Sequence, residues 1–219
     1  MSITAQQVAF DKIMNKTVKH WPPPVFKYED YSGKLYWTLI IRPNKEITDN
    51  LSSAISEMEQ KWPEHIYYRP DYFHVTMSGI GGVSEIKDYK DRIIEACQNA
   101  SQNISRIEIE ARGLTLGNSI MAMILDTGGN LSKYVFKMRQ LFKESNISIN
   151  EYDDIHTRLW WIVLTRFSKA ADRAIIDYIE NNNETKYGLF SVKEIDLVEA
   201  DKTLDTNKTR LIKKIKLSK

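Results

Sequence analysis

The feature of this sequence that most constrains its fold is an order of strand, helix, strand, helix and strand that occurs twice. The first set of predicted elements occupies residues 34–116 and the second residues 119–217. The serine that can cap the second helix is Ser84 in the first set and Ser168 in the second, 84 residues further on. This recurrence predicts an internal duplication, with a chance repetition of common elements as the alternative. Two such halves facing each other would form a single α+β domain with a cleft between two sheets.

Strands are predicted where aromatic and β-branched residues run together, and helices where apolar residues recur at helical spacing behind a capping residue. The glycine-rich segment 79–82 predicts a turn after the second strand. We expect one domain over residues 1–219, with a helical segment 1–21, ended by prolines, packed outside the two halves. The predicted strands are 34–42, 71–78, 105–116, 119–125, 158–167, 190–200 and 210–217, and the predicted helices within the halves are 48–61, 84–100, 130–144 and 168–181.

Composition limits the function further. The chain has 31 lysines and arginines against 29 aspartates and glutamates, a net charge of +2 that argues against coating DNA but allows a local basic groove. The single cysteine, Cys97, excludes an internal disulfide, and no group of Cys and His has the spacing of a structural zinc site. No apolar run is long enough to span a membrane, and Gln6 and Gln7 interrupt the segment where a signal peptide needs an apolar core. We therefore expect a cytoplasmic protein with no metal, no cofactor and no membrane partner.

The segment His74-Val75-Thr76 is the sharpest chemical feature of the chain. Residues two apart in a strand point to the same side, so the imidazole of His74 and the hydroxyl of Thr76 would face one surface. An imidazole can take or give a proton near neutral pH, and a hydroxyl beside it can hydrogen-bond a phosphate oxygen. The pair would suit phosphate-ester chemistry, although a strand histidine held by a structural hydrogen bond would give the same pattern.

This arrangement resembles the 2H phosphoesterase superfamily, which includes 2′-5′ RNA ligases and cyclic phosphodiesterases. Members of that family are duplicated domains in which each half carries one H-x-T/S motif, and the two motifs face each other across a cleft. The resemblance spans residues 34–217, and the segment 74–81 is similar to the first family motif. It implies a two-lobed α+β fold with two antiparallel sheets around a central cleft and helices outside. It also implies His74 as acid or base and Thr76 as a phosphate-binding residue.

The second family motif, H-x-T-L-x-R-F, corresponds to residues 161–167 of this chain. The leucine, arginine and phenylalanine of the pattern are present, but Trp161 stands in place of the histidine and Val163 in place of the threonine. In this register the second catalytic half-site is missing. The face of Trp161 could stack on a nucleobase instead, or the ring could pack in the core beside Trp160.

A shifted register would place His156 at the second site, because His156-Thr157-Arg158 lies just ahead of this segment. The residue two positions on would then be Arg158, which has no hydroxyl. His156 also lies five positions before Trp161, an odd number that points it to the opposite side of a regular strand. His156 therefore remains a candidate catalytic residue that needs a bulge or an irregular backbone to enter the cleft.

Further candidates for substrate binding lie near these motifs. Arg42, at the end of the first strand, and Arg166 could each pair with a phosphate or be ordinary surface arginines. Tyr72 belongs, with Tyr68, to a group of aromatic residues that precedes His74. Such a group suits single-stranded RNA, but it also suits a loop packed on a sheet.

The resemblance implies a protein that acts on RNA ends or nucleotides with a 2′,3′-cyclic phosphate or a 2′-5′ linkage. Because the second motif is incomplete, the alternative is a domain that binds RNA or nucleotide without turnover. Loss of one proton-transferring group typically costs about 10²–10⁴-fold in rate, so we expect binding with weak or absent cyclic phosphodiesterase activity. A purely structural role would require His74 to be buried with no cavity beside it.

Overall fold

The structure, a computed structural model, describes every residue except 1, 31–32, 148–158, 205 and 219. No helix among the described residues is both long and apolar enough to cross a membrane. The helices are α1 (Ile3–Lys19), α2 (Lys45–Lys61), α3 (Lys90–Ala100), α4 (Asn130–Glu144) and α5 (Ala174–Asn181), with 3₁₀ turns η1 (Tyr28–Asp30), η2 (Pro70–Tyr72) and η3 (Lys87–Tyr89). The strands are β1 (Tyr36–Ile41), β2 (Ile66–Tyr67), β3 (Val75–Gly82), β4 (Ile107–Leu116), β5 (Ile120–Asp126), β6 (Trp160–Val163), β7 (Thr165–Arg166), β8 (Lys186–Val192), β9 (Glu194–Ala200) and β10 (Arg210–Lys216).

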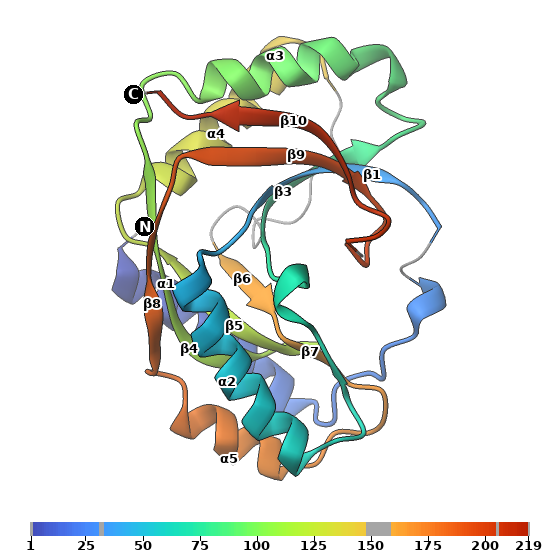
Figure 1. Ribbon diagram of the computed structural model, residues 1–219, viewed down its shortest axis with the longest axis vertical. Helices are drawn as coiled ribbons and strands as arrows, with labels where there is room; N and C mark the ends of the chain where they lie inside the picture. Colours follow the sequence, from blue (N-terminus) through green and yellow to red (C-terminus); the bar gives the residue numbers. More distant parts are fainter. Residues whose placement is uncertain (1, 31–32, 148–158, 205, 219) are drawn as a thin grey trace.

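Two four-stranded antiparallel sheets form the centre of the molecule (Figure 1). Their strand orders are β10-β9-β1-β3 and β8-β4-β5-β6. In the first sheet α2 connects β1 to β3, and in the second α4 connects β5 to β6. The predicted α+β architecture with two antiparallel sheets is confirmed. The matching strand orders are those that a duplicated chain would give, and the duplication itself remains a prediction.

The two sheets do not follow the division of the sequence into residues 34–116 and 119–217. The strand β4 comes from the first half of the sequence, but it pairs with β5 and β8. Conversely, β9 comes from the second half and pairs with β1 and β10. The first half of the sequence therefore contributes β4 to the second sheet, and the second half contributes β9 and β10 to the first sheet.

The glycine-rich segment 79–82, predicted as a turn, is instead the second part of strand β3. It pairs with β1, and Gly81 lies opposite Trp37. A methyl group added to Gly81 would come within 2.8 Å of the side chain of Ile86. Glycine is needed at this point because the backbone packs closely against its neighbour, a role that glycine also has inside strands.

The two serines predicted as helix caps do not begin helices. The helix α3 begins at Lys90 and α5 at Ala174, so the separation of 84 residues is kept while both starts are later than predicted. The carboxylate of Asp172 accepts a hydrogen bond from the backbone N–H of Ala174 at 2.9 Å. Asp172 therefore satisfies a free N–H of the first turn of α5, the role predicted for Ser168.

The strand predicted over residues 158–167 is divided at Leu164 into β6 and β7. The N–H of Leu164 donates to the carbonyl of Ile120 in β5 at 2.9 Å, and its carbonyl accepts from the N–H of Tyr68 at 2.9 Å. The chain thus leaves the second sheet at this residue and pairs with β2. This change of partner brings Arg166 and Tyr68 next to each other.

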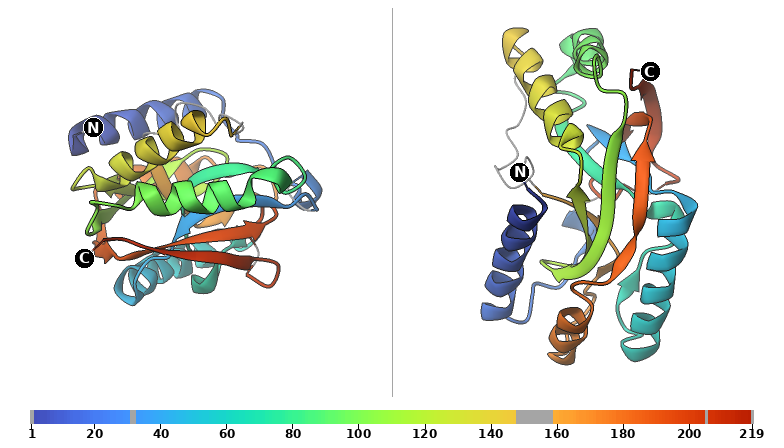
Figure 2. Two further views of the ribbon diagram at one scale, coloured as in Figure 1. Left: turned by 90° about the horizontal axis from the view of Figure 1, so that it is seen from above. Right: turned by 90° about the vertical axis from the view of Figure 1, so that its left-hand side faces the viewer.

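The helices lie outside the strands, and Figure 2 shows α1 and α2 on opposite sides of them. The helix α1 is anchored by Gln6, whose buried side-chain amide accepts a hydrogen bond from the N–H of Asp126 (2.9 Å) and donates one to its carbonyl (3.3 Å). Phe10 of α1 belongs to a small apolar cluster against which Trp161 packs. The other buried members of that cluster are Met123, Leu125 and Leu159.

Candidate functional site

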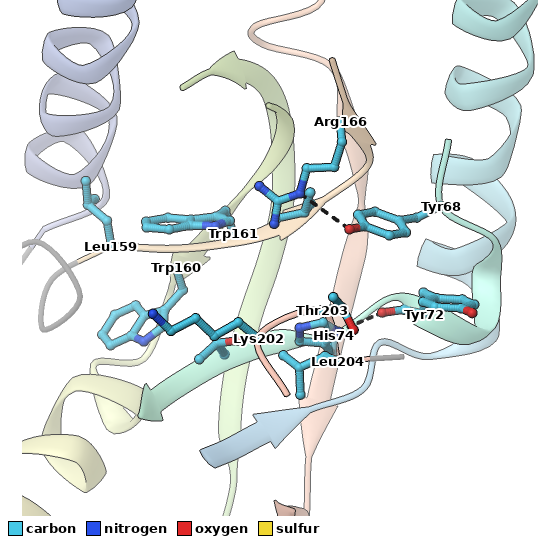
Figure 3. Close-up of a pocket in the computed structure, with 12 residues that line it drawn as sticks. Tyr68, Tyr72, His74, Leu159, Trp160, Trp161, Arg166, Lys202, Thr203 and Leu204 are labelled. Atoms are coloured by element: carbon cyan, nitrogen blue, oxygen red, sulfur yellow. Dashed lines mark hydrogen bonds between the residues drawn. The ribbon is translucent and has the colours of Figure 1, made fainter. Parts of the chain in front are cut away.

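A cavity of about 170 Å³ lies between β3 of one sheet and β6 of the other (Figure 3). His74 and Thr76 form what we call the β3 wall, and Trp161 and Val163 form the β6 wall. The rest of the lining comes from the segment between β2 and β3, from the start of β6, from β7 and from the loop after β9. The other residues that line this first cavity are Tyr68, Tyr72, Leu159, Trp160, Arg166, Lys202, Thr203 and Leu204.

The β3 wall follows from strand alternation. Val75 and Met77 are fully buried in the main core, so the side chains of His74 and Thr76 are turned to the other side and reach the cavity. Both are partly exposed there. The structure therefore places the imidazole and the hydroxyl on one surface, next to an open space.

The β6 wall follows from the same alternation. Of the two adjacent tryptophans, Trp160 takes the core position: it is 1% exposed, and its indole N–H donates a hydrogen bond to the carbonyl of Met77 in β3 at 3.3 Å. Trp161 is partly exposed and faces the cavity together with Val163. The hydrogen bond from Trp160 joins β6 to β3, which fixes the two walls relative to each other.

The environment of His74 sets its protonation. Its Nδ1 is 2.7 Å from the carbonyl oxygen of Tyr72, and because a carbonyl only accepts, Nδ1 carries the proton and Nε2 keeps its lone pair. Burial lowers the pKa of His74 from 6.5 to about 4; the bond to Tyr72 opposes this change, and the charges of Arg42 and Arg166 add to it. His74 is therefore neutral near pH 7 and acts through Nε2 as an acceptor.

Two cationic side chains of the described residues reach the cavity. Arg166 of β7 holds its Nε 3.4 Å from the hydroxyl of Tyr68, and its guanidinium carbon lies 5.3 Å from the ring centroid of Phe26. The Nζ of Lys202, in the loop after β9, lies 5.5 Å from the ring centroid of Tyr36. Positive charge beside the hydroxyl groups of the lining favours an anionic ligand.

Most of the predicted site residues that the structure describes meet at this cavity, and Arg42 does not. Arg42 is exposed and does not line it; its Nη1 donates to the carbonyl of Asp71 at 3.0 Å, just before the β3 wall. His156 lies outside the described residues. In the described part of the chain no three His, Cys, Asp or Glu side chains gather as a metal ion would require. The predicted residues that do line the cavity are His74, Thr76, Tyr72, Trp161 and Arg166.

No sequence pattern indicated the wall formed by the loop after β9, which contributes Lys202, Thr203 and Leu204. This loop reaches the cavity because β9 pairs with β1 in the sheet that contains β3. The aromatic group before the β3 wall could be recognised in the sequence, but only some of its members line the cavity. The ring of Tyr68 lines the cavity, whereas the hydroxyl of Tyr67 donates to carbonyls at the end of α2 and its neighbouring turn.

The sequence matches no protein-family model and no curated protein. The structure, in contrast, is similar to several crystal structures over most of its length. One, described as a phosphoesterase, has a TM-score of 0.61 at 12% sequence identity and covers 85% of this chain and 100% of its own. The protein TT0787 of Thermus thermophilus has a TM-score of 0.63 at 14% identity and covers 84% of this chain and 98% of its own. LigT of E. coli, complexed with 3′-AMP, has a TM-score of 0.58 at 13% identity and covers 85% of this chain and 100% of its own.

The chain has the 2H phosphoesterase fold. The fold implied by the segment 74–81 and by the pattern in residues 161–167 is therefore confirmed. At these sequence identities the 2H phosphoesterase likeness does not define the chemistry. The chemistry of this 2H fold has to be argued from the side chains that line the cavity.

Proposed function

We propose that this chain binds a nucleotide or an RNA end through its phosphate in the cavity between β3 and β6, with weak or absent hydrolysis. The observation that carries the proposal is that a β3 wall of His74 and Thr76 and a β6 wall of Trp161 and Val163 line the same cavity. LigT has been crystallised with 3′-AMP, with ATP and with phosphate. These compounds are therefore the first ligands to test.

The phosphate belongs at the β3 wall. The hydroxyl of Thr76 can donate a hydrogen bond to a phosphate oxygen, and Arg166 and Lys202 bring positive charge to the same cavity. Hydrogen bonds between charged partners are roughly twice as strong as those between neutral partners, so the cations contribute most of the affinity for the anion.

The nucleobase belongs at the β6 wall. Trp161 offers an aromatic face to the cavity, and stacking of a base on an aromatic side chain contributes about 1–3 kcal/mol. Val163 beside it is apolar and adds no polar group that a base would leave unpaired. The residues that depart from the family pattern thus favour binding of a planar group.

Hydrolysis of a 2′,3′-cyclic phosphate needs two proton transfers. Water attacks phosphorus and loses a proton, the bond from phosphorus to one ribose oxygen breaks, and that oxygen takes up a proton. His74, neutral with a lone pair on Nε2, suits the first transfer. It is the only histidine among the described residues that line the cavity, so the released oxygen has no second histidine among them to protonate it. Loss of one such group typically costs about 10²–10⁴-fold.

The test compares binding with turnover. Calorimetry with 3′-AMP should detect binding to the wild type, and Thr76→Val, which keeps the shape but removes the hydroxyl, should weaken it. Hydrolysis of 2′,3′-cyclic AMP should be slow and should disappear in His74→Ala. His20→Ala, which changes an exposed histidine at the end of α1, is the matched control and should change neither result.

Absence of 3′-AMP binding to the wild type, or binding indifferent to Thr76→Val, would contradict the proposal. A crystal soaked in phosphate gives an independent measurement. The anion should lie within hydrogen-bonding distance of both His74 and Thr76. If no anion is bound at the β3 wall at high phosphate concentration, the proposed phosphate site is wrong.

A further inference from the structure

A second, larger cavity of about 330 Å³ adjoins the first one, and the proposed function does not use it. It lies on the first sheet, over β9, β1 and β3. Thr76, Lys202 and Leu204 line both cavities, so the two spaces meet at the β3 wall. The remaining residues that line the second cavity are Tyr36, Trp37, Thr38, Met77, Ser78, Gly79, Ile80, Gly81, Ala200 and Asp201.

The sequence explains why space is left on this part of the sheet. Tyr36, the first residue of β1, is paired with Ala200 of β9 on one side and with Gly82 of β3 on the other. Directly paired residues in a sheet are close neighbours, so these small partners do not cover the ring of Tyr36, which stays partly exposed with the ammonium group of Lys202 over it. The strand β3 adds Gly79 and Gly81 to the floor. An aromatic ring surrounded by small residues forms a shallow apolar site.

The sizes of the two cavities are informative. Small-molecule sites usually measure about 300–1,000 Å³. The first cavity, at about 170 Å³, falls below this range, whereas the second, at about 330 Å³, lies within it. A ligand held by the β3 wall alone would fill little of the available space. A ligand that extends past Thr76 into the second cavity would use both.

The charges at the boundary indicate which part of such a ligand goes where. Lys202 lines both cavities and lies over the ring of Tyr36, so its ammonium group can reach an anion at the junction. The buried carboxylate of Asp201 lines only the second cavity and accepts a hydrogen bond from the N–H of Thr203 at 2.9 Å. A carboxylate in the second cavity disfavours an anion there, but it can accept a hydrogen bond from an uncharged group. The phosphate therefore belongs at the junction.

We infer that the ligand is a dinucleotide unit, either free or at the end of an RNA strand, and that the second cavity holds its second nucleoside. The linking phosphate lies at Thr76 and Lys202, one base faces Trp161, and the other base faces Tyr36. This inference rests on the proposed function, because it places the phosphate at the same β3 wall. It adds a second stacking surface and predicts a preference for two linked nucleosides over one.

The experiment compares the dinucleotide ApA, with a 3′-5′ and with a 2′-5′ linkage, with 3′-AMP by calorimetry on the wild type. At least one ApA should bind about 10-fold tighter than 3′-AMP, as expected for one additional stacked base. Tyr36→Ala should remove this advantage and leave the affinity for 3′-AMP within about twofold. Tyr36→Phe, which keeps the ring, should restore it.

Tyr28→Ala is the matched control, because Tyr28 is an exposed tyrosine with a lysine, Lys208, over its ring, and it lines neither cavity. It should leave the affinities for both ligands unchanged. If 3′-AMP binds but neither ApA binds tighter, the dinucleotide inference is overturned and the proposed function stands. Equal losses of both ligands in Tyr36→Ala would overturn it as well. If neither ligand binds the wild type, the proposed function and the inference both fail.

Discussion

The β3 wall presents a histidine and a threonine to the cavity, and the β6 wall presents a tryptophan and a valine from the corresponding strand of the other sheet. The two strands show the same alternation. Each wall residue is next to a fully or almost fully buried residue, which is Val75 or Met77 in one strand and Trp160 or Ile162 in the other. Only the side chains that face the cavity differ in chemical type.

This difference separates the requirements of the fold from those of the chemistry. The buried neighbours of the wall residues hold the strands in place, and these neighbours are apolar in both sheets. The side chains at the cavity are only partly buried, so Trp161 and Val163 can stand on β6 where β3 has His74 and Thr76 while both strands keep the same fold. The fold of this chain is therefore compatible with either pair of side chains at the cavity, and both binding and turnover have to be argued residue by residue.

The largest expected effect comes from making the β6 wall equal to the β3 wall. The double substitution Trp161→His and Val163→Thr gives the cavity a second imidazole and a second hydroxyl. If the backbone presents them as β3 presents its own pair, hydrolysis of 2′,3′-cyclic AMP should rise by about 10²-fold or more, measured as kcat/KM. Trp161→Phe, which keeps an apolar ring, should give no increase. An unchanged rate in the double variant would show that the walls are not equivalent.

Fast hydrolysis of 2′,3′-cyclic AMP by the wild type would contradict the expected difference between the two walls, and it could do so in one of two ways. If activity disappears in His74→Ala and also in His156→Ala, then His156 is the second catalytic group. If activity is robust and indifferent to His156→Ala, one histidine suffices for this reaction.

A smaller effect is expected when the β6 wall loses its ring. Trp161→Ala removes the stacking surface and should weaken binding of 3′-AMP by about 5–150-fold, the equivalent of about 1–3 kcal/mol. Trp161→Phe should recover most of the affinity. Binding of inorganic phosphate, which has no base, should stay unchanged. An equal loss for phosphate and 3′-AMP would assign Trp161 a structural role instead of a stacking role.

The smallest expected effect is on the pH dependence of stability. Of the two walls, only the β3 wall contains a group that titrates, His74. The pKa of His74 is about 4 in the folded protein against 6.5 for an unperturbed histidine, and burial lowers the pKa of His65 in the same direction. Between these values the unfolded chain binds protons that the folded chain does not. Stability is therefore complete above about pH 6.5 and declines as pH falls toward about 4.

Urea unfolding at about pH 7.5 and about pH 5 measures this decline. His74→Gln should make it smaller, and Trp161→Phe should leave it unchanged because the β6 wall has no titrating group. A wild-type stability that rises on acidification would contradict the assignment of a neutral His74.

The sequence predicted the β3 wall because strand alternation is a local property: His74 and Thr76 share one side of their strand by a period of two, whichever sheet the strand joins. For the β6 wall the sequence left open whether Trp161 faces a ligand or packs in the core, because alternation alone does not say which side of a strand is buried. The wall formed by Lys202 and its neighbours was not predictable in this way. It depends on β9 pairing with β1 from the other end of the chain, and no local pattern specifies such a pairing.

The glycines of residues 79–82 illustrate the opposite error. Glycine favours turns, so the segment was predicted to end the strand. In the structure the same lack of a side chain serves the close approach of Gly81 to Ile86, and the strand continues. A preference for one local conformation does not distinguish between these two uses, since only the packed structure supplies the neighbour.

The anchoring of α1 by Gln6 has a consequence for the boundaries of the domain. The amide of Gln6 pairs with the end of β5 as a neighbouring strand would, and the Phe10 cluster supports Trp161 from behind. The described residues 2–21 stand outside the two matching halves and contribute no atom to the lining of the first cavity. They nevertheless support the β6 wall, because Trp161 packs against the cluster that contains Phe10. A fragment trimmed to residues 34–217 would keep its proton acceptor and lose the rigidity of its stacking surface.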